Sequence, residues 1–152
     1  MENRIRGFEV VKDSARKFPS EEITLPQRGT ARAMAYDFFA NADYDIEPGK
    51  IAKVWTDIKA YMQDGECLLL NVRSSMGGKL MLANIQGWVD ADYYNNEGND
   101  GNIGFFLYNM SDEVQHIKQG DKIGQGAFMP FLVADNGNTT EERKGGFGST
   151  GK

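Results

Sequence analysis

The chain has 152 residues, of which 40% are apolar and 26% are charged, and its net charge is −5. This length and composition predict one globular domain. The acidic balance excludes a long nucleic-acid track as the ligand, although a few arginines and backbone amides can still bind a small polyphosphate. No basic leader and no apolar run of roughly 18 residues, the length of a membrane span, is present. We therefore expect a soluble, cytoplasmic protein without membrane contact.

Short runs rich in β-branched and aromatic residues predict strands at 5–11, 66–72, 103–108 and 127–133. Turn signals separate such runs, and their glycines are Gly49, Gly65, Gly98, Gly101, Gly120 and Gly137. Many short strands at this spacing predict an all-β sandwich or barrel. The single cysteine, Cys67, lies in an apolar run and is predicted to be a buried, inert thiol.

The segment 51–62 permits two predictions. Its apolar residues recur at the three-, four- and seven-residue spacing of a helix face. From Val54 to Ala60 it also alternates as a strand does, directly after the turn at Pro48-Gly49. The pattern alone does not decide between helix and strand. From residue 135 onward the composition is polar and rich in glycine, which predicts a mobile end.

Five segments carry candidate chemistry, and the first two contain an acid and an arginine. Asp37 ends a small-residue approach and is either a solvated strand end or a functional acid. Arg73, Ser74 and Ser75 stand before the glycine turn 77–78, where a guanidinium, two hydroxyls and free amides suit phosphate oxygens. The alternative is a turn that a serine caps.

The third and fourth segments contain a carboxylate and an amide. Asp90 follows Trp88 and Val89, and partial desolvation by this apolar pair favours a proton acceptor. The alternative is a bulged turn in which Asp90 accepts backbone amides. Gln125 closes the fourth segment, 120–125, and is either a ligand-binding group or a surface amide.

The fifth segment, 143–151, places an aromatic residue between glycines. Phe147 could stack on a flat ring while Arg143, Ser149 and Thr150 address phosphates, and the glycines let the backbone fold over a ligand. A disordered chain end is the alternative.

In this order the five segments resemble the five signature motifs of the trimeric dUTPase family of bacterial or phage type. Gly-Gly-Phe-Gly-Ser-Thr-Gly stands intact at 145–151, and Asn84, Gly87, Asp90 and Tyr93 keep the family spacing, with Val89 for an isoleucine. The resemblance implies a distorted β-jelly roll, strand structure at 51–62, and one short helix after Arg73-Ser74-Ser75. It also implies a homotrimer with composite sites, a β-domain at 1–138 and a flexible arm at 139–152 that closes over the site.

The resemblance further implies Mg²⁺-dependent hydrolysis of dUTP to dUMP and pyrophosphate, which limits uracil in DNA and supplies dUMP for thymidylate synthesis. Asp90 would deprotonate the attacking water, and Tyr93 would pack under the deoxyribose and exclude UTP. Asn84 and a hairpin after Tyr93 would read uracil. Asp37 would act on Mg²⁺ through water, with the triphosphate as its main ligand. The residues implied in substrate binding are Arg73, Ser74, Ser75, Asn84, Gly87, Trp88, Val89, Tyr93, Gln125, Arg143, Phe147, Gly148, Ser149 and Thr150.

Three departures and two rival functions accompany the resemblance. The stretch 73–84 is shorter than in many relatives, the polar run 94–102 replaces the usual Gly-Glu, and the arm is shorter between Arg143 and Phe147, so that Lys144 could share the work of Arg143. A dCTP deaminase would need a glutamate on the strand 103–108, which has no acid. The other rival is a dUTPase-like scaffold that captures a regulatory protein, with 94–102 as the place to look.

Overall fold

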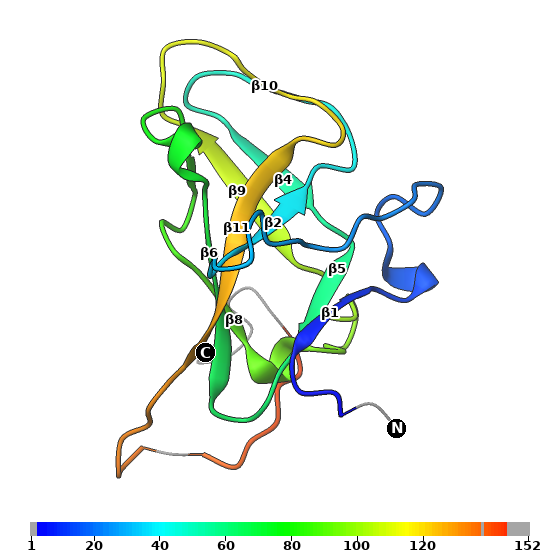
Figure 1. Cartoon of the computed structure of the whole chain (residues 1–152), viewed down its shortest axis with the longest axis vertical. Helices are drawn as coiled ribbons and strands as arrows, with labels where there is room; N and C mark the ends of the chain where they lie inside the picture. Colours follow the sequence, from blue (N-terminus) through cyan, green and yellow to red (C-terminus); the bar gives the residue numbers. More distant parts are fainter. Residues whose placement is uncertain (1–2, 138, 146–152) are drawn as a thin grey trace.

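The computed structural model describes residues 3–137 and 139–145, and short strands make up most of its regular structure (Figure 1). The strands are β1 (Gly7–Val10), β2 (Tyr36–Phe39), β3 (Tyr44–Ile46), β4 (Ile51–Trp55), β5 (Ile58–Tyr61), β6 (Glu66–Asn71), β7 (Leu80–Leu82), β8 (Gly87–Asp90), β9 (Gly104–Asn109), β10 (Gln115–Ile117) and β11 (Lys122–Pro130). Three single-turn 3-10 helices join them: η1 (Asp13–Ala15), η2 (Ser74–Met76) and η3 (Ala91–Tyr93).

Four antiparallel sheets organise these strands. The largest has the order β2-β11-β6-β8, and a three-stranded sheet has the order β4-β9-β7. Two ribbons, β1-β5 and β10-β3, complete the set. In the described ranges no strand pairs with the strand next to it in sequence, which is the connectivity expected of a jelly roll rather than of simple hairpins.

The core lies between the four-stranded and three-stranded sheets. Strand β9 alternates between buried and half-buried residues, and its Phe105 and Leu107 are fully buried. Phe105 meets Phe38 of β2 with ring centroids 5.0 Å apart, so this aromatic pair joins the two sheets. The period-two pattern of the sequence thus sets which face of each strand enters the core.

The predicted strands at 5–11, 66–72 and 103–108 are confirmed as β1, β6 and β9. The strand predicted at 127–133 is part of β11, which begins earlier, at Lys122, and ends at Pro130. It ends there because Pro130 pairs with Glu66, the first residue of β6, and the partner strand then runs out. The glycines of the six turn signals all have positive φ, between 77° and 92°.

The segment 51–62 forms two strands, so the strand interpretation is confirmed and the helical one is wrong. Between β4 and β5, Asp57 takes a φ of 58°, and its carboxylate accepts the amides of Lys17 at 2.8 Å and Phe18 at 2.9 Å. This break shifts the phase of the apolar pattern from one strand to the next. The two strands together therefore imitate the spacing of a helix.

The short helix expected after Arg73-Ser74-Ser75 is η2, a 3-10 turn that includes both serines. Cys67 is confirmed as buried, and burial, with the charge of Asp90 as a lesser cause, raises the pKa of its thiol. Over the described ranges, no helix has the length and apolar character needed to cross a membrane.

Candidate functional site

One cluster of polar side chains lies where β2, β11 and β6 run side by side. Gln125 of β11 pairs with Asp37 of β2 on one side and with Asn71 of β6 on the other. Arg73 follows Asn71 closely and brings its Nε to 3.7 Å from the Asp37 carboxylate, while Lys122 Nζ approaches the same carboxylate to 3.4 Å. We call Asp37, Arg73, Ser74, Ser75, Lys122 and Gln125 the arginine cluster.

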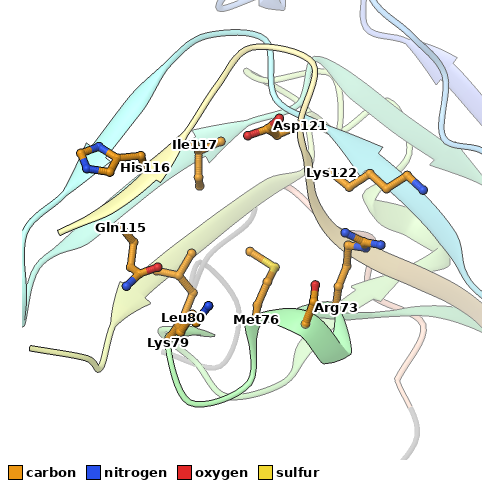
Figure 2. Close-up of a pocket in the computed structure, with 10 residues that line it drawn as sticks. Arg73, Met76, Lys79, Leu80, Gln115, His116, Ile117, Asp121 and Lys122 are labelled. Carbon is orange, nitrogen blue, oxygen red and sulfur yellow. The ribbon is translucent and has the colours of Figure 1, made fainter. Parts of the chain in front are cut away.

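A pocket of about 290 Å³ adjoins this cluster (Figure 2). Arg73 and Lys122 lie at one end of it, Lys79 and His116 lie toward the other, and Met76 points into it. Ser75 and Asp121 are also in its lining. Three permanently charged cations against one carboxylate favour an anionic ligand, and the arginine can bind phosphate oxygens in bidentate fashion.

A second cluster lies at the end of β8. The strand alternates, so Gly87 and Val89 are buried while Trp88 and Asp90 share the outer face. Trp88 is 68% exposed and the Asp90 side chain is 61% exposed. The expected desolvation of Asp90 by Trp88 and Val89 is therefore wrong within a single chain, because one residue points to solvent and the other to the core.

Tyr93 follows in η3 and is buried. Its hydroxyl donates to the carbonyl of Asn102 at 2.6 Å and accepts from the side-chain amide of Asn99 at 2.9 Å. Burial raises the pKa of Tyr93, and the Asn99 hydrogen bond and the charge of Arg143 oppose that rise. The phenol is thus a fixed, neutral group close to Asp90.

Arg143 folds back onto this second cluster from the C-terminal segment. Its guanidinium contacts the carboxylate of Asp90, bonds Asp92 at 2.8 Å and lies 5.9 Å from the ring centroid of Tyr93. Burial alone would lower the pKa of Arg143, but the hydrogen bond to Asp92 and the charge of Asp90 outweigh it and raise the pKa. We call Asp90, Asp92, Tyr93 and Arg143 the aspartate cluster.

The two clusters lie at different ends of the four-stranded sheet. Asp37 and Asn71 share a row with Gln125, whereas Asp90 pairs with Cys67, four residues earlier on β6. Four residues span about 13 Å along a strand, and three strand spacings span about 14 Å across the sheet, so the two carboxylates are roughly 20 Å apart. A base must lie within a hydrogen bond, or one water, of the group on which it acts. One chain alone therefore cannot apply Asp90 to an anion held by Arg73.

The residues before β8 have separate surroundings. Asn84 lies exposed in the turn that precedes β8, at the opposite end of that strand from Asp90. Gly87 is buried, and a Cβ there would lie 2.7 Å from the Cβ of Leu70, so the close pairing of β8 with β6 requires glycine. Gly87 thus has a packing role whatever it contributes to a ligand.

The run 94–102 forms successive turns, so the expected hairpin after Tyr93 is not present. The amides of Asp100, Gly101 and Asn102 are donated within the segment, and the amide of Asn96 is donated to the carbonyl of Tyr93. These amides are not available to read a base. Asp100 bonds Lys59 Nζ at 2.8 Å, which ties the run to β5.

The predicted residues Phe147, Gly148, Ser149 and Thr150 lie outside the described residues. Among described ones, sequence reasoning did not single out Lys122, Asn99 or Asn102 as functional. Lys122 stands in the same segment as Gln125, but simple alternation would put the two on opposite faces of β11; the register shift between Lys122 and Gly124 brings Lys122 to Asp37, and the sequence gives no signal for that shift. Asn99 and Asn102 belong to the polar run 94–102, where no spacing rule marks an individual asparagine.

The described residues contain no group of three or more His, Cys, Asp or Glu side chains that could hold a metal ion. Asp37 is a single carboxylate with a 14% exposed side chain, between Arg73 and Lys122. Mg²⁺ is commonly bound by one or two carboxylates together with substrate phosphates and several waters. This donor set would fit Mg²⁺ held mainly by a bound polyphosphate, with Asp37 as the carboxylate that would contact it through water.

Fold and clusters together define an all-β, jelly-roll-like protein with an anion-binding cluster and a separate acid–tyrosine cluster. The family model for dUTPase matches residues 21–151, and the chain belongs to the dUTPase family. The deoxyuridine 5'-triphosphate nucleotidohydrolase of Lactococcus lactis subsp. lactis (strain IL1403) is 45% identical over 152 residues, which cover 97% of this chain and 99% of the relative.

Solved structures agree with this assignment. The dUTPase from Streptococcus mutans matches with a TM-score of 0.73 and 40% identity, over 86% of this chain and 99% of that chain. The dUTPase from phage phi11 of S. aureus has a TM-score of 0.65 at 21% identity, over 90% of this chain and 96% of that one. This second likeness bears on the fold alone.

Proposed function

We propose that this protein hydrolyses dUTP to dUMP and pyrophosphate, and that it does so in the cytoplasm. The observation that carries the proposal is the pair formed by an accessible Asp90 at the end of β8 and a buried Tyr93 on the next turn. An exposed carboxylate can accept a proton from water, and a rigid ring beside it can support a sugar. Membership of the dUTPase family supports the choice of substrate.

The chemistry is a water attack on the α-phosphorus. Asp90 accepts a proton from the water while the water oxygen bonds to the α-phosphorus. The bond from the α-phosphorus to the bridging oxygen breaks, and pyrophosphate leaves with the electron pair of that bond. Arg73, Ser74, Ser75 and Gln125 hold the phosphates. Their donors are in place before the charge develops, which favours the transition state.

Mg²⁺ fits this scheme as a companion of the triphosphate, where it would neutralise phosphate charge when bound. Asp37 would hold it through water. A structural Mg(II) ion is described for a mutant dUTPase from phage phi11 of S. aureus. Lys122 and Arg73 keep the Asp37 carboxylate oriented toward the cluster.

In this proposal, residues on and next to β8 recognise the nucleoside. Tyr93 packs under the deoxyribose, Asn84 reads uracil, and Trp88, Val89 and Gly87 shape the strand that carries them. From the arm, Arg143, Ser149 and Thr150 bind phosphates while Phe147 and Gly148 cover uracil. Arg143 now lies on Asp90 and over Tyr93, so it must leave both when a nucleotide binds.

The roughly 20 Å between Asp90 and Asp37 within one chain supports a composite site. A neighbouring copy can bring its Asp90 and Tyr93 to the arginine cluster of the first, and a closed ring of three such contacts gives a homotrimer. The regulatory-scaffold alternative stays a prediction: the run 94–102, where such a partner was expected to bind, is tied to β5 through Lys59 and leaves Asn95, Glu97 and Gly98 exposed.

A pyrophosphate-release assay tests the proposal. The four substrates are dUTP, dCTP, dTTP and UTP, each with and without Mg²⁺. Release from dUTP alone, enhanced by Mg²⁺, is expected. Equal release from dUTP and UTP would refute the role given to Tyr93, and deamination of dCTP would place the protein with the rival enzyme.

A further inference from the structure

The hydroxyl of Tyr93 is held from two sides by one short segment. It donates to the backbone carbonyl of Asn102 at 2.6 Å and accepts from Nδ2 of Asn99 at 2.9 Å. The phenolic hydrogen and an acceptor site are therefore both used. A tyrosine ring with its far end tied in this way cannot tilt without the loss of both bonds.

The side chain of Asn99 has only one satisfactory orientation. Its Oδ1 accepts from the amide of Gly101 at 3.0 Å and from Nδ2 of Asn96 at 3.0 Å. Because two donors face the oxygen, the nitrogen must face Tyr93, where it meets the hydroxyl. Asn99 is thus a bridge from the fold of the segment to the ring.

Asn102 is fixed just as firmly. It is fully buried, its amide bonds the Asn99 carbonyl at 3.0 Å, and its Oδ1 accepts the amide of Asp57 at 2.9 Å. Between these two asparagines, Gly101 has a φ of 81°, and a Cβ there would lie 2.5 Å from the carbonyl oxygen of Tyr93. The segment therefore packs closely against the backbone of Tyr93 at Gly101 and also hydrogen-bonds the Tyr93 hydroxyl.

We propose that Asn99 and Asn102 are positioning residues that set the discrimination between deoxyribose and ribose. This inference rests on the proposed function, in which the sugar lies on Tyr93. UTP differs from dUTP by one hydroxyl group, so a ring excludes it only if the ring cannot give way. Site geometry held to about half an ångström needs this kind of supporting shell. The polar run 94–102 supplies it.

The variant Asn99→Asp tests the proposal because it replaces the donor with an acceptor, so the single hydrogen of the Tyr93 hydroxyl can no longer hold it from both sides. The carboxylate is nearly isosteric and still accepts from Gly101 and Asn96, but it has no donor for Tyr93. We expect the ratio of kcat/KM for dUTP to kcat/KM for UTP to fall roughly threefold to tenfold, the worth of one hydrogen bond. The change should appear mainly as a gain in UTP hydrolysis, which a general loss of structure would not produce.

A double-mutant cycle with Tyr93→Phe isolates the bond. Tyr93→Phe keeps the ring and removes the hydroxyl, so it should lower the same ratio, and Asn99→Asp should have no further effect on it. Glu97→Gln, an exposed charge change in the same segment, is the matched control and should leave the ratio unchanged.

The outcomes separate the two claims. If the wild-type protein is active, a ratio that Tyr93→Phe leaves unaltered would overturn the positioning role alone, and so would a kcat/KM that Asn99→Asp lowers equally for dUTP and UTP. If Asn99→Asp does not fold, Tyr93→Phe decides by itself. A wild-type protein that does not hydrolyse dUTP would overturn the proposed function, and this inference with it.

Discussion

Asp90 shares the outer face of β8 with Trp88, and its carboxylate reaches both solvent and Arg143. Replacement by a nearly isosteric amide should leave the fold and dUTP binding largely intact. Loss of the base should lower kcat by about 10²–10⁴. Steady-state pyrophosphate release and equilibrium binding of a non-hydrolysable dUTP analogue measure the two quantities for Asp90→Asn.

Asp92 provides the matched control, because it is an equally exposed carboxylate that also bonds Arg143. Asp92→Asn should keep most of the activity. A kcat above about half of the wild-type value in Asp90→Asn would remove this residue from the mechanism, since loss of a general base costs far more.

At this scale the sequence predicts residue identities better than residue environments. Asp90 and Tyr93 could be named from spacing because the family keeps them at a fixed interval. The exposure of Trp88 could not, because it depends on which face of β8 meets the core. The contact of Lys122 with Asp37 depends in turn on the pairing of β11 with β2, which no local pattern fixes.

At the scale of elements, β5 and the run 94–102 are joined by a buried ion pair. Lys59 and Asp100 have side chains only 10% and 7% exposed. Burial would raise the pKa of Asp100, but the Lys59 hydrogen bond and the Lys12 amide outweigh it and lower the pKa below 3.8. Lys59→Met leaves a buried carboxylate unpaired, and we expect it to lower the free energy of unfolding by about 3–5 kcal/mol.

The lowered pKa of Asp100 gives this pair a pH dependence of known sign. A depressed carboxyl pKa adds stability above its ordinary value, 3.8, and the gain is lost as the pH falls through the folded-state value. The stability difference between wild type and Asp100→Asn should therefore be full at neutral pH and shrink below pH 3.8. Urea denaturation of both proteins at neutral pH and at a pH below 3.8 measures this difference in the free energy of unfolding. The exposed Asp112→Asn should show no such difference, and a gap for Asp100→Asn that persists in acid would contradict the assignment.

The C-terminal segment is the element whose role is least visible in one chain. Deletion of residues 143–152 should leave thermal stability nearly unchanged and lower kcat more than it raises KM, because closure over the substrate serves the transition state. Steady-state kinetics and a thermal melt of the same preparation check this. A kcat within about twofold of wild type would mean that the segment does not serve catalysis, since a closing lid contributes to the rate itself.

Elements were predictable where one pattern dominated. Strands β1, β6 and β9 follow directly from alternation and flanking turns. The segment 51–62 did not, because Asp57 breaks the strand and shifts the apolar phase. A left-handed aspartate held by amides from residues 17 and 18 is a tertiary event, so only the family resemblance could decide between helix and strand.

For the whole molecule, the separation of the two clusters is the property that matters most. Chains with Arg73→Ala lack a working arginine cluster, and chains with Asp90→Asn lack a working aspartate cluster. Each preparation alone should be nearly inactive. When the two are unfolded together and refolded, some contacts between unlike chains join two intact clusters, and we expect pyrophosphate release to reappear.

Mass spectrometry of the mixed assemblies supplies the control, because it shows that unlike chains have associated. If mixed trimers form and activity stays absent, each chain builds its own site. If light scattering shows a monomer and the same preparation is fully active, the composite site is contradicted directly.

The proposed division of the site between two copies also has a consequence for mixtures of normal and defective chains. A chain that has lost both clusters spoils the sites of its intact neighbours as well as its own. In a cell that makes normal and doubly defective chains together, the number of complete sites falls as the square of the normal fraction. We therefore expect such a chain to lower activity by more than its own share, and we expect two singly defective chains that damage opposite ends of the sheet to restore complete sites when they assemble together. The distance between Asp37 and Asp90 thus predicts how defective alleles of this protein combine.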